Sequence, residues 1–137
     1  MCGYLTYFWN SKRKFSYKNF VKGVAKIEKR GPDNKRIIKN DTNLLGFTRL
    51  AIIDKSSRSN QPFISENKRY YLMFNGEIYN YLELKKKLKK TNFKTNSDTE
   101  VLFYLLINYG IKKTLNLIEG MFSFILLDKK KKTFCAA

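Results

Sequence analysis

The chain has 137 residues, which is enough for one domain with its own core and too few for two domains of ordinary size. It contains no histidine and only two cysteines, Cys2 and Cys135, so classical zinc sites and a cysteine–histidine dyad are excluded and we expect no metal. The net charge is +17, from 28 Lys and Arg against 11 Asp and Glu; it could indicate nucleic-acid binding, but scattered lysines are more typical of a solvated surface.

The first half of the chain predicts three strands and a helix. Residues 3–9 are apolar, β-branched or aromatic and predict a buried strand. A helix is expected over 16–29, with Ser16 as its N-cap and an apolar face made of Phe20, Val21, Val24 and Ile27. After a turn around Gly31–Pro32–Asp33, the pattern predicts a short strand at 35–39, a turn at 41–43 and a longer strand at 44–54.

The second half predicts further strands and two main helices. Residues 56–62 form a polar loop, and residues 68–76 a strand that ends in an Asn75–Gly76 turn. Helices are expected at 78–90 and at 97–110, the second with a capping box of Ser97 and Glu100 and an end at Gly110. A short helix at 111–118, a strand at 120–128, a lysine turn and the start of a last strand follow. Short hairpin-type links favour an α+β domain with antiparallel sheets and helices on their faces.

Cys2 is the first residue along the chain that could take part in a chemical reaction. A thiol needs a base to become a good nucleophile, and loss of Met1 would leave Cys2 with its own α-amine, whose reference pKa is about 7.7–8.0. Gly3 would leave room for a substrate to approach the backbone. The alternative is that Cys2 is a small apolar residue at the start of a strand.

Three other polar features have both a functional and a structural interpretation. The side-chain amide of Asn75 and the N–H of Gly76 could form an oxyanion hole, or simply a turn. Arg49, within an apolar strand, could bind a substrate carboxylate in bidentate fashion or form an ion pair with Asp54 or Asp33. Asp98, at the start of a helix whose dipole would lower its pKa, could bind an ammonium group or only cap the helix. Together these groups are what hydrolysis of the glutamine side-chain amide requires.

Seven stretches carry a family resemblance, in order and over nearly the whole chain: MCG at the start, RGPD (30–33), RLAIID (49–54), QP (61–62), FNGEIYNY (74–81), SDTEV (97–101) and GMFSF (120–124). With them the chain resembles the glutaminase domain of glutamine-hydrolysing asparagine synthetases, which are class II glutamine amidotransferases of the N-terminal-nucleophile (Ntn) hydrolase type. The resemblance implies a four-layer αββα sandwich with two antiparallel sheets. It implies one glutamine amidotransferase domain over 1–137, incomplete at its C-terminus because the last strand has only begun.

The resemblance also implies roles for individual residues. Cys2 matches the nucleophile freed by loss of Met1, and Asn75 and Gly76 match the oxyanion hole. Arg49 matches the residue that binds the glutamine carboxylate, and Asp98 matches the contact to the α-amino group. The glutamine-binding residues implied are Arg49, Leu50, Ala51, Ile52, Ile53, Asn75, Gly76, Glu77 and Asp98.

Two departures from the family pattern are visible. Phe47 stands where the family commonly has a polar residue, which concerns local packing. The chain also has no Gly-rich phosphate loop, so we expect no cofactor here, with ATP and Mg²⁺ serving only an absent synthetase domain that converts aspartate to asparagine with the ammonia.

The expected partners are therefore glutamine and such a synthetase domain or subunit, with homodimer formation left open. Two rival functions are a catalytically inactive fragment that binds glutamine or a partner, and, less favoured, a basic nucleic-acid-binding protein. No apolar run reaches the roughly 18 residues that a membrane span needs, and the start lacks the order of a signal peptide. We expect no membrane contact and a cytoplasmic location.

Overall fold

The computed structural model describes residues 2–9, 16–89 and 91–137. The chain divides into two compact units, Met1–Ala51 and Ile52–Ala137, each of which is described by itself. Each unit contains one antiparallel sheet with helical structure packed on it. The expected α+β class with two antiparallel sheets is therefore confirmed.

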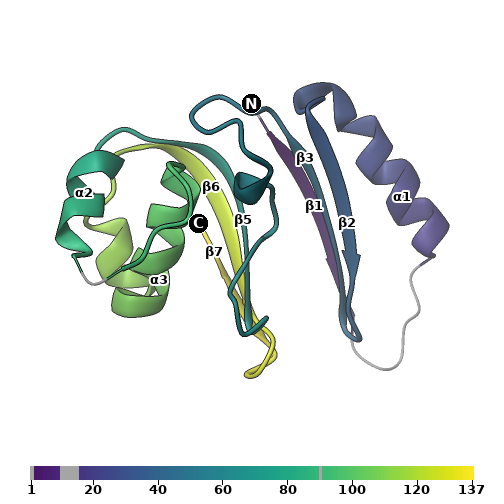
Figure 1. The fold of residues 1–137 in the computed structure, drawn as a ribbon. Helices are drawn as coiled ribbons and strands as arrows, with labels where there is room; N and C mark the ends of the chain where they lie inside the picture. Colours follow the sequence, from purple (N-terminus) through teal and green to yellow (C-terminus); the bar gives the residue numbers. More distant parts are fainter. Residues whose placement is uncertain (1, 10–15, 90) are drawn as a thin grey trace. The chain divides into compact units, whose positions relative to one another are not determined.

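The first unit is a three-stranded sheet in the order β1 (Gly3–Phe8), β3 (Asn43–Arg49), β2 (Asn34–Lys39). The helix α1 (Tyr17–Lys26) packs on one face of this sheet, as Figure 1 shows. Phe20 and Val24 of α1 are buried there against Leu44 of β3. A 3₁₀ turn, Glu28–Arg30, follows the helix.

Two expectations for the first unit hold only in part. Ser16 caps α1 by accepting a hydrogen bond from the N–H of Asn19, but Val21 is 38% exposed and does not belong to the buried face. The strand expected at 44–54 ends at Arg49. Asp33 is the reason, because its N–H donates to the carbonyl of Arg49 and its carboxylate accepts from the N–H of Ala51. These bonds hold the segment after β3 against the turn before β2.

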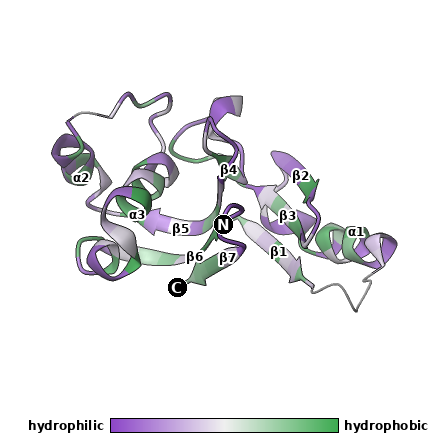
Figure 2. Ribbon diagram, turned by 90° about the horizontal axis from the view of Figure 1, so that it is seen from below, coloured by the Kyte–Doolittle hydropathy of each residue, from purple (hydrophilic) through white to green (hydrophobic). Residues whose placement is uncertain are grey.

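The second unit is a four-stranded sheet in the order β4 (Phe63–Ile64), β5 (Tyr70–Ile78), β6 (Gly120–Asp128), β7 (Thr133–Ala136). Strands β6 and β7 are hydrophobic over much of their length in Figure 2. Helices α2 (Tyr81–Lys87) and α3 (Asp98–Leu115) cover one face of this sheet (Figure 1). The core between sheet and helices is built largely from Leu72, Phe74, Ile78, Leu84, Leu102, Leu105 and Phe124.

The Asn75–Gly76 dipeptide is not a turn. Both residues lie inside β5, opposite Ser123 and Phe122 of β6, and the strand continues to Ile78. Glycine is required because φ is +154° at Gly76 and an added Cβ would lie 2.1 Å from the carbonyl oxygen of Met121. The turn prediction was wrong because a close backbone approach within a sheet selects the same residue as a tight turn.

The start of α3 also differs from the expected capping box. Ser97 caps the helix by accepting from the N–H of Thr99 at 3.2 Å. The carboxylate of Glu100 accepts instead from the N–H groups of Lys94 and Thr95 and from the hydroxyl of Thr95. Gly110 interrupts the helix as expected, with φ +76°, and helical structure then continues to Leu115.

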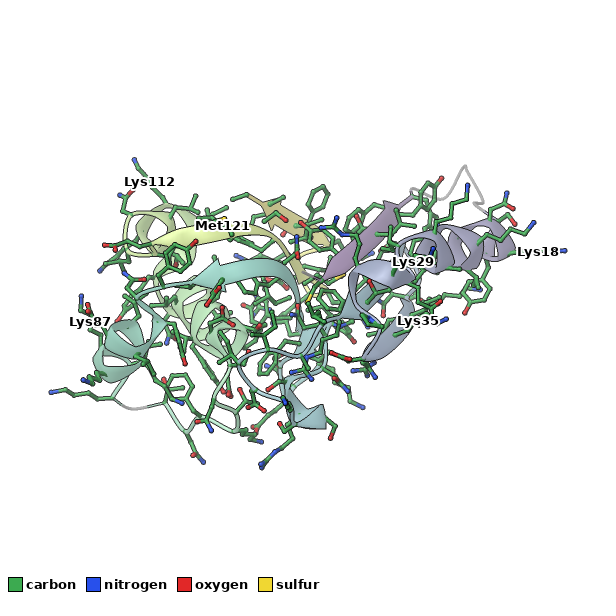
Figure 3. All side chains as sticks on the ribbon, turned by 90° about the horizontal axis from the view of Figure 1, so that it is seen from above. Lys18, Lys29, Lys35, Lys87, Lys112 and Met121 are labelled. Atoms are coloured by element: carbon green, nitrogen blue, oxygen red, sulfur yellow. The ribbon has the colours of Figure 1, made fainter. Side chains whose placement is uncertain are left out.

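Nearly all lysines among the described residues are exposed. Figure 3 shows the side chains of Lys18 in the first unit and of Lys87 and Lys112 in the second extending away from their ribbons. Among the described helices, none combines the length and the apolar character needed to cross a lipid bilayer.

Candidate functional site

Cys2 lies at the start of β1, beside the end of β3. Because Gly3 pairs with Thr48, the residue before β1 comes next to the residues that follow Thr48. The N–H of Leu50 lies 3.4 Å from Cys2 Sγ, and the thiol donates to the carbonyl of Leu50 at 3.6 Å. The half-buried sulfur is therefore in contact with both the N–H and the carbonyl of Leu50, so main-chain polar groups surround it on this side.

The RGPD turn holds these two strand ends together. Arg30 donates from Nε to the carbonyl of Cys2 at 3.2 Å. Gly31 lies so close to β3 that an added Cβ would be 2.4 Å from the carbonyl carbon and oxygen of Thr48. Asp33 accepts from the N–H of Ala51 at 2.7 Å. The motif was visible in the sequence, but its role as a clamp on Cys2 and Ala51 was not.

Arg49 is the last residue of β3 and is 6% exposed. Its position beside Leu50 brings it to the same end of the first sheet as Cys2. The carboxylate of Asp33 accepts from the N–H of Ala51. The carboxylate of Asp54, in the second unit, accepts from the N–H groups of Ser56 and Asn96.

In the second unit, Asn75 and Gly76 occupy the middle of β5. The Oδ1 atom of Asn75 is buried and has no hydrogen-bond partner among the described residues. Leaving a buried carbonyl oxygen without a donor costs about 1–3 kcal/mol, so such an atom needs an explanation. The unpartnered atom is the acceptor of the Asn75 amide, whereas the donor that an oxyanion hole would use is its Nδ2 atom.

Asp98 begins α3 and is 4% exposed. Its Oδ2 atom accepts from the N–H of Ile78 at 3.1 Å, which brings the carboxylate to the end of β5. Burial raises the pKa of Asp98 above its usual value, and the hydrogen bonds from the N–H groups of Ile78 and Thr99 only partly offset this. The expected lowering by the helix dipole is therefore wrong, because burial outweighs it.

A cation bound beside Asp98 would oppose the effect of burial on the pKa of this carboxyl group. No ion pair to Asp98 occurs among the residues that the structure describes. A substrate ammonium group placed there would compensate the buried charge and lower the pKa of the carboxylate. The nearby acidic Glu77, exposed on β5, adds to the same preference for positive charge.

The remaining expected residues fall into the two units as follows. Leu50 and Ala51 follow β3 in the first unit, next to Cys2 and Asp33. Ile52 and Ile53 begin the second unit outside any strand, and Ile52 is 67% exposed. Across the described residues, no three His, Cys, Asp or Glu side chains gather in a way that could hold a metal ion.

A family described as glutamine amidotransferase domain matches residues 1–137. Asparagine synthetase [glutamine-hydrolyzing] 1 of Arabidopsis thaliana is 41% identical over 112 residues, covering 82% of this chain and 19% of that protein. The corresponding enzyme of Zea mays is 44% identical over the same shares. Asparagine synthetase [glutamine-hydrolyzing] 2 of Arabidopsis thaliana is 38% identical over 140 residues, covering all of this chain and 24% of that protein.

One solved structure is also similar. It is a glutamine phosphoribosylpyrophosphate amidotransferase from B. subtilis complexed with ADP and GMP, with 29% identity and a TM-score of 0.53 over 64% of this chain and 21% of the other. The chain therefore spans about a fifth to a quarter of the length of the proteins that it matches.

Proposed function

Because the chain belongs to the glutamine amidotransferase domain family, we propose that it hydrolyses the side-chain amide of glutamine to glutamate and ammonia, with Cys2 as the nucleophile. The observation that carries the proposal is the N–H of Leu50 at 3.4 Å from Cys2 Sγ, at the end of the sheet where Arg49 lies. It supports a thiol that lies against main-chain polar groups rather than one packed as an apolar residue.

The first half of the reaction needs a base and an oxyanion hole. After loss of Met1, which lies outside the described residues, the α-amine of Cys2 takes the thiol proton, directly or through one water. The sulfur attacks the amide carbon, and the carbonyl oxygen becomes an oxyanion that accepts hydrogen bonds from the side-chain amide of Asn75 and the N–H of Gly76. When the tetrahedral intermediate collapses, the C–N bond breaks and the ammonium of Cys2 returns its proton to the leaving ammonia.

The second half releases glutamate. Water attacks the thioester carbon while the same α-amine accepts its proton, and the C–S bond breaks to restore the thiol. Throughout, Arg49 binds the α-carboxylate of the substrate and Asp98 binds its α-ammonium group. Main-chain groups of residues 50–53, Gly76 and Glu77 complete the glutamine contacts. The burial of Asp98 supports this assignment, since a buried carboxylate binds a cation more strongly than an exposed one does.

The relatives' names favour asparagine synthesis as the use of the ammonia. In this proposal a synthetase domain or subunit receives the ammonia and activates aspartate with ATP and Mg²⁺. The site residues proposed here bind glutamine, and none of them is proposed to bind ATP.

The test is glutamate release from glutamine by the chain whose first residue is Cys2. We expect Cys2→Ala to reduce turnover by about 10³-fold or more, the loss typical of removing a nucleophile. Cys135→Ser is the matched control, because burial raises the pKa of the Cys135 thiol and leaves it a poorer nucleophile, so its removal should not alter turnover.

A second pair of chains tests the base. A chain with one extra glycine before Cys2 keeps the thiol but moves the free amine to another residue, and we expect it to lose turnover. Activity in that chain, or in one shown by intact mass to retain Met1, would refute the mechanism. Glutamine binding by calorimetry without glutamate release would favour the inactive binding fragment instead. Salt-sensitive retardation of RNA or DNA would favour the nucleic-acid function.

A further inference from the structure

The QP motif has no role in the proposed mechanism. Its glutamine, Gln61, is nevertheless buried and forms several side-chain hydrogen bonds within the second unit. Gln61 is 4% exposed and lies between the 3₁₀ turn Ser57–Ser59 and β4. Its Oε1 atom accepts from the N–H of Phe74 at 2.7 Å, and its Nε2 atom donates to the carbonyl of Phe74 at 3.1 Å. The same Nε2 atom lies 3.5 Å from Oγ1 of Thr99.

The two bonds to Phe74 take the place of a rung of the sheet. In the antiparallel pairing of β4 with β5, Phe63 lies opposite Leu72 and Ile64 opposite Tyr71. If the same register is extended two residues before Phe63, Gln61 lies opposite Phe74. The ladder itself stops after two residues of β4. A side-chain amide carries the same C=O and N–H groups as a peptide unit. Gln61 therefore satisfies the main chain of β5 at the residue directly before Asn75.

A second contact holds the other end of residues 75–77 of β5. Asp98 binds the N–H of Ile78, while Gln61 binds Phe74, so residues 75–77 lie between two connections from β5 to other elements. The contact of Gln61 with Thr99 reaches α3 one residue after Asp98. Phe74 and Thr99 are 2% and 3% exposed, so water does not compete for these bonds.

We infer that Gln61 is a positioning residue for glutamine hydrolysis, which fixes the Asn75–Gly76 segment of β5 and the Asp98 end of α3 relative to each other. The inference rests on the proposed function of these residues. Gln61 touches neither substrate nor the reacting atoms in this assignment. Its effect is to hold the oxyanion donors and the ammonium-binding carboxylate in one geometry, which matters because small displacements of such groups lower the rate strongly.

Two variants of Gln61 separate positioning from bulk stability. Gln61→Met keeps the size of the side chain and removes all three contacts, and we expect kcat to fall at least tenfold at a temperature where circular dichroism shows a folded chain. Gln61→Glu keeps the acceptor for Phe74 when ionised and regains a donor when protonated, and burial raises the pKa of a carboxyl group. Its kcat relative to the unsubstituted protein should therefore rise as the pH is lowered from 8 to 6.

Thr114→Val is the matched control. It removes a partly buried hydrogen bond of the same unit, which the buried Thr114 donates from Oγ1 to the carbonyl of Gly110 at 2.7 Å, near the opposite end of α3. We expect it to lower thermal stability while leaving kcat and its pH profile unchanged. A Gln61→Met kcat within twofold of the unsubstituted protein would overturn the inference. So would an equal kcat loss in Thr114→Val, or a Gln61→Glu ratio that does not change with pH.

A spectroscopic readout keeps this inference separate from the proposed function. If the unsubstituted full chain does not hydrolyse glutamine, the proposed function fails, and positioning is then judged from ¹⁵N spectra of the side-chain amide of Asn75 and the N–H of Gly76. Shifts of both signals in Gln61→Met and in neither for Thr114→Val would support the inference. Unshifted signals in Gln61→Met would contradict it.

Discussion

The two units support their candidate residues in different ways. In the first unit, Cys2 and Arg49 lie at strand ends, where the sheet stops and the RGPD turn clamps the chain. In the second unit, Asn75 and Gly76 lie in the middle of a nine-residue strand that is paired throughout with β6. Reactive groups can therefore be presented either at the end of a sheet or on a strand whose other neighbour stops early, as β4 does.

The supporting contacts differ in burial as well. The clamp in the first unit uses Arg30 and Asp33, which are both exposed. The second unit uses Gln61, Asp98 and Glu100, of which none is more than 4% exposed. Because a hydrogen bond shielded from water is worth more and costs more when broken, substitutions in the second unit should have the larger effects.

The largest effect is expected at Gly76. In Gly76→Ala the new Cβ would meet the carbonyl oxygen of Met121, and φ of +154° is unfavourable for any side chain, so we expect a loss of about 4 kcal/mol or more in unfolding free energy. Gly110→Ala is the control, since its φ of +76° and ψ of 170° disfavour a side chain but nothing lies within 4 Å, and a loss of about 1–3 kcal/mol is expected. Urea denaturation measures both. Equal losses would show that strand pairing at Gly76 is looser than the structure indicates.

The next effect concerns Glu100, which is fully buried. Glu100→Gln removes a charge that accepts from two N–H groups and a hydroxyl in residues 94–95, and we expect a loss of about 2 kcal/mol. Ser97→Ala removes the helix cap and the hydrogen bond that Ser97 Oγ donates to Asp98 Oδ1 at 3.4 Å, for about 1 kcal/mol. If the capping box predicted from sequence were correct, the two substitutions would not be additive. Additive losses in the double variant would instead confirm separate roles.

Much of the fold could be predicted from sequence because the strongest signals are local. Alternating and continuous apolar runs located β1, β5 and β6, and Ser16 and Gly110 marked helix ends as expected. The two-residue strand β4 carries too little pattern to be recognised. The end of β3 at Arg49 depends on Asp33, a contact across the chain that no local pattern contains.

The sequence named residues for the candidate site, but it did not contain the geometry in which the structure holds them. The family resemblance implied the site residues. Asn75–Gly76 was interpreted as a turn because glycine alone does not distinguish a turn from a close approach of two strands. The pKa of Asp98 was predicted with the wrong sign, because burial by elements distant in sequence outweighs the local helix dipole. Gln61 drew attention only as part of a motif, since its partner Phe74 is 13 residues away.

A smaller effect is expected from the exposed clamp of the first unit. Asp33→Ala removes the bond to the N–H of Ala51, and we expect a loss of about 1.5 kcal/mol because the carboxylate is open to water. The KM for glutamine should rise severalfold, since Leu50 and Ala51 are expected to contact the substrate. Asp41→Ala, another exposed carboxylate in a turn of the same unit, should leave both quantities unchanged. A larger loss for Asp33→Ala than for Glu100→Gln would reverse the comparison between the units.

The smallest expected effect is on the pH dependence of the unfolding free energy, through Asp128 of the second unit. The hydrogen bonds and ion pair with Arg69 lower the pKa of Asp128 from 3.8 to about 2. A carboxyl group with a lowered folded-state pKa stabilises the fold above its unfolded pKa, and this contribution is lost as the pH falls from about 4 to about 2. We expect it to be about 1 kcal/mol, because Arg69 is partly exposed and the pair is screened.

Asp128→Asn should remove that part of the acid dependence and flatten the unfolding free energy between pH 4 and pH 2. Some slope should remain, because hydrogen bonds from the N–H groups of Asn96 and Ser56 outweigh burial and lower the pKa of Asp54 to about 2.

Asp98→Asn should change the unfolding free energy at neutral pH in the opposite direction. Its raised pKa makes the folded state lose stability as the pH rises above 3.8, so removing the carboxyl group should stabilise the protein at neutral pH while weakening glutamine binding. Stabilisation without any change in glutamine affinity would separate Asp98 from the substrate site.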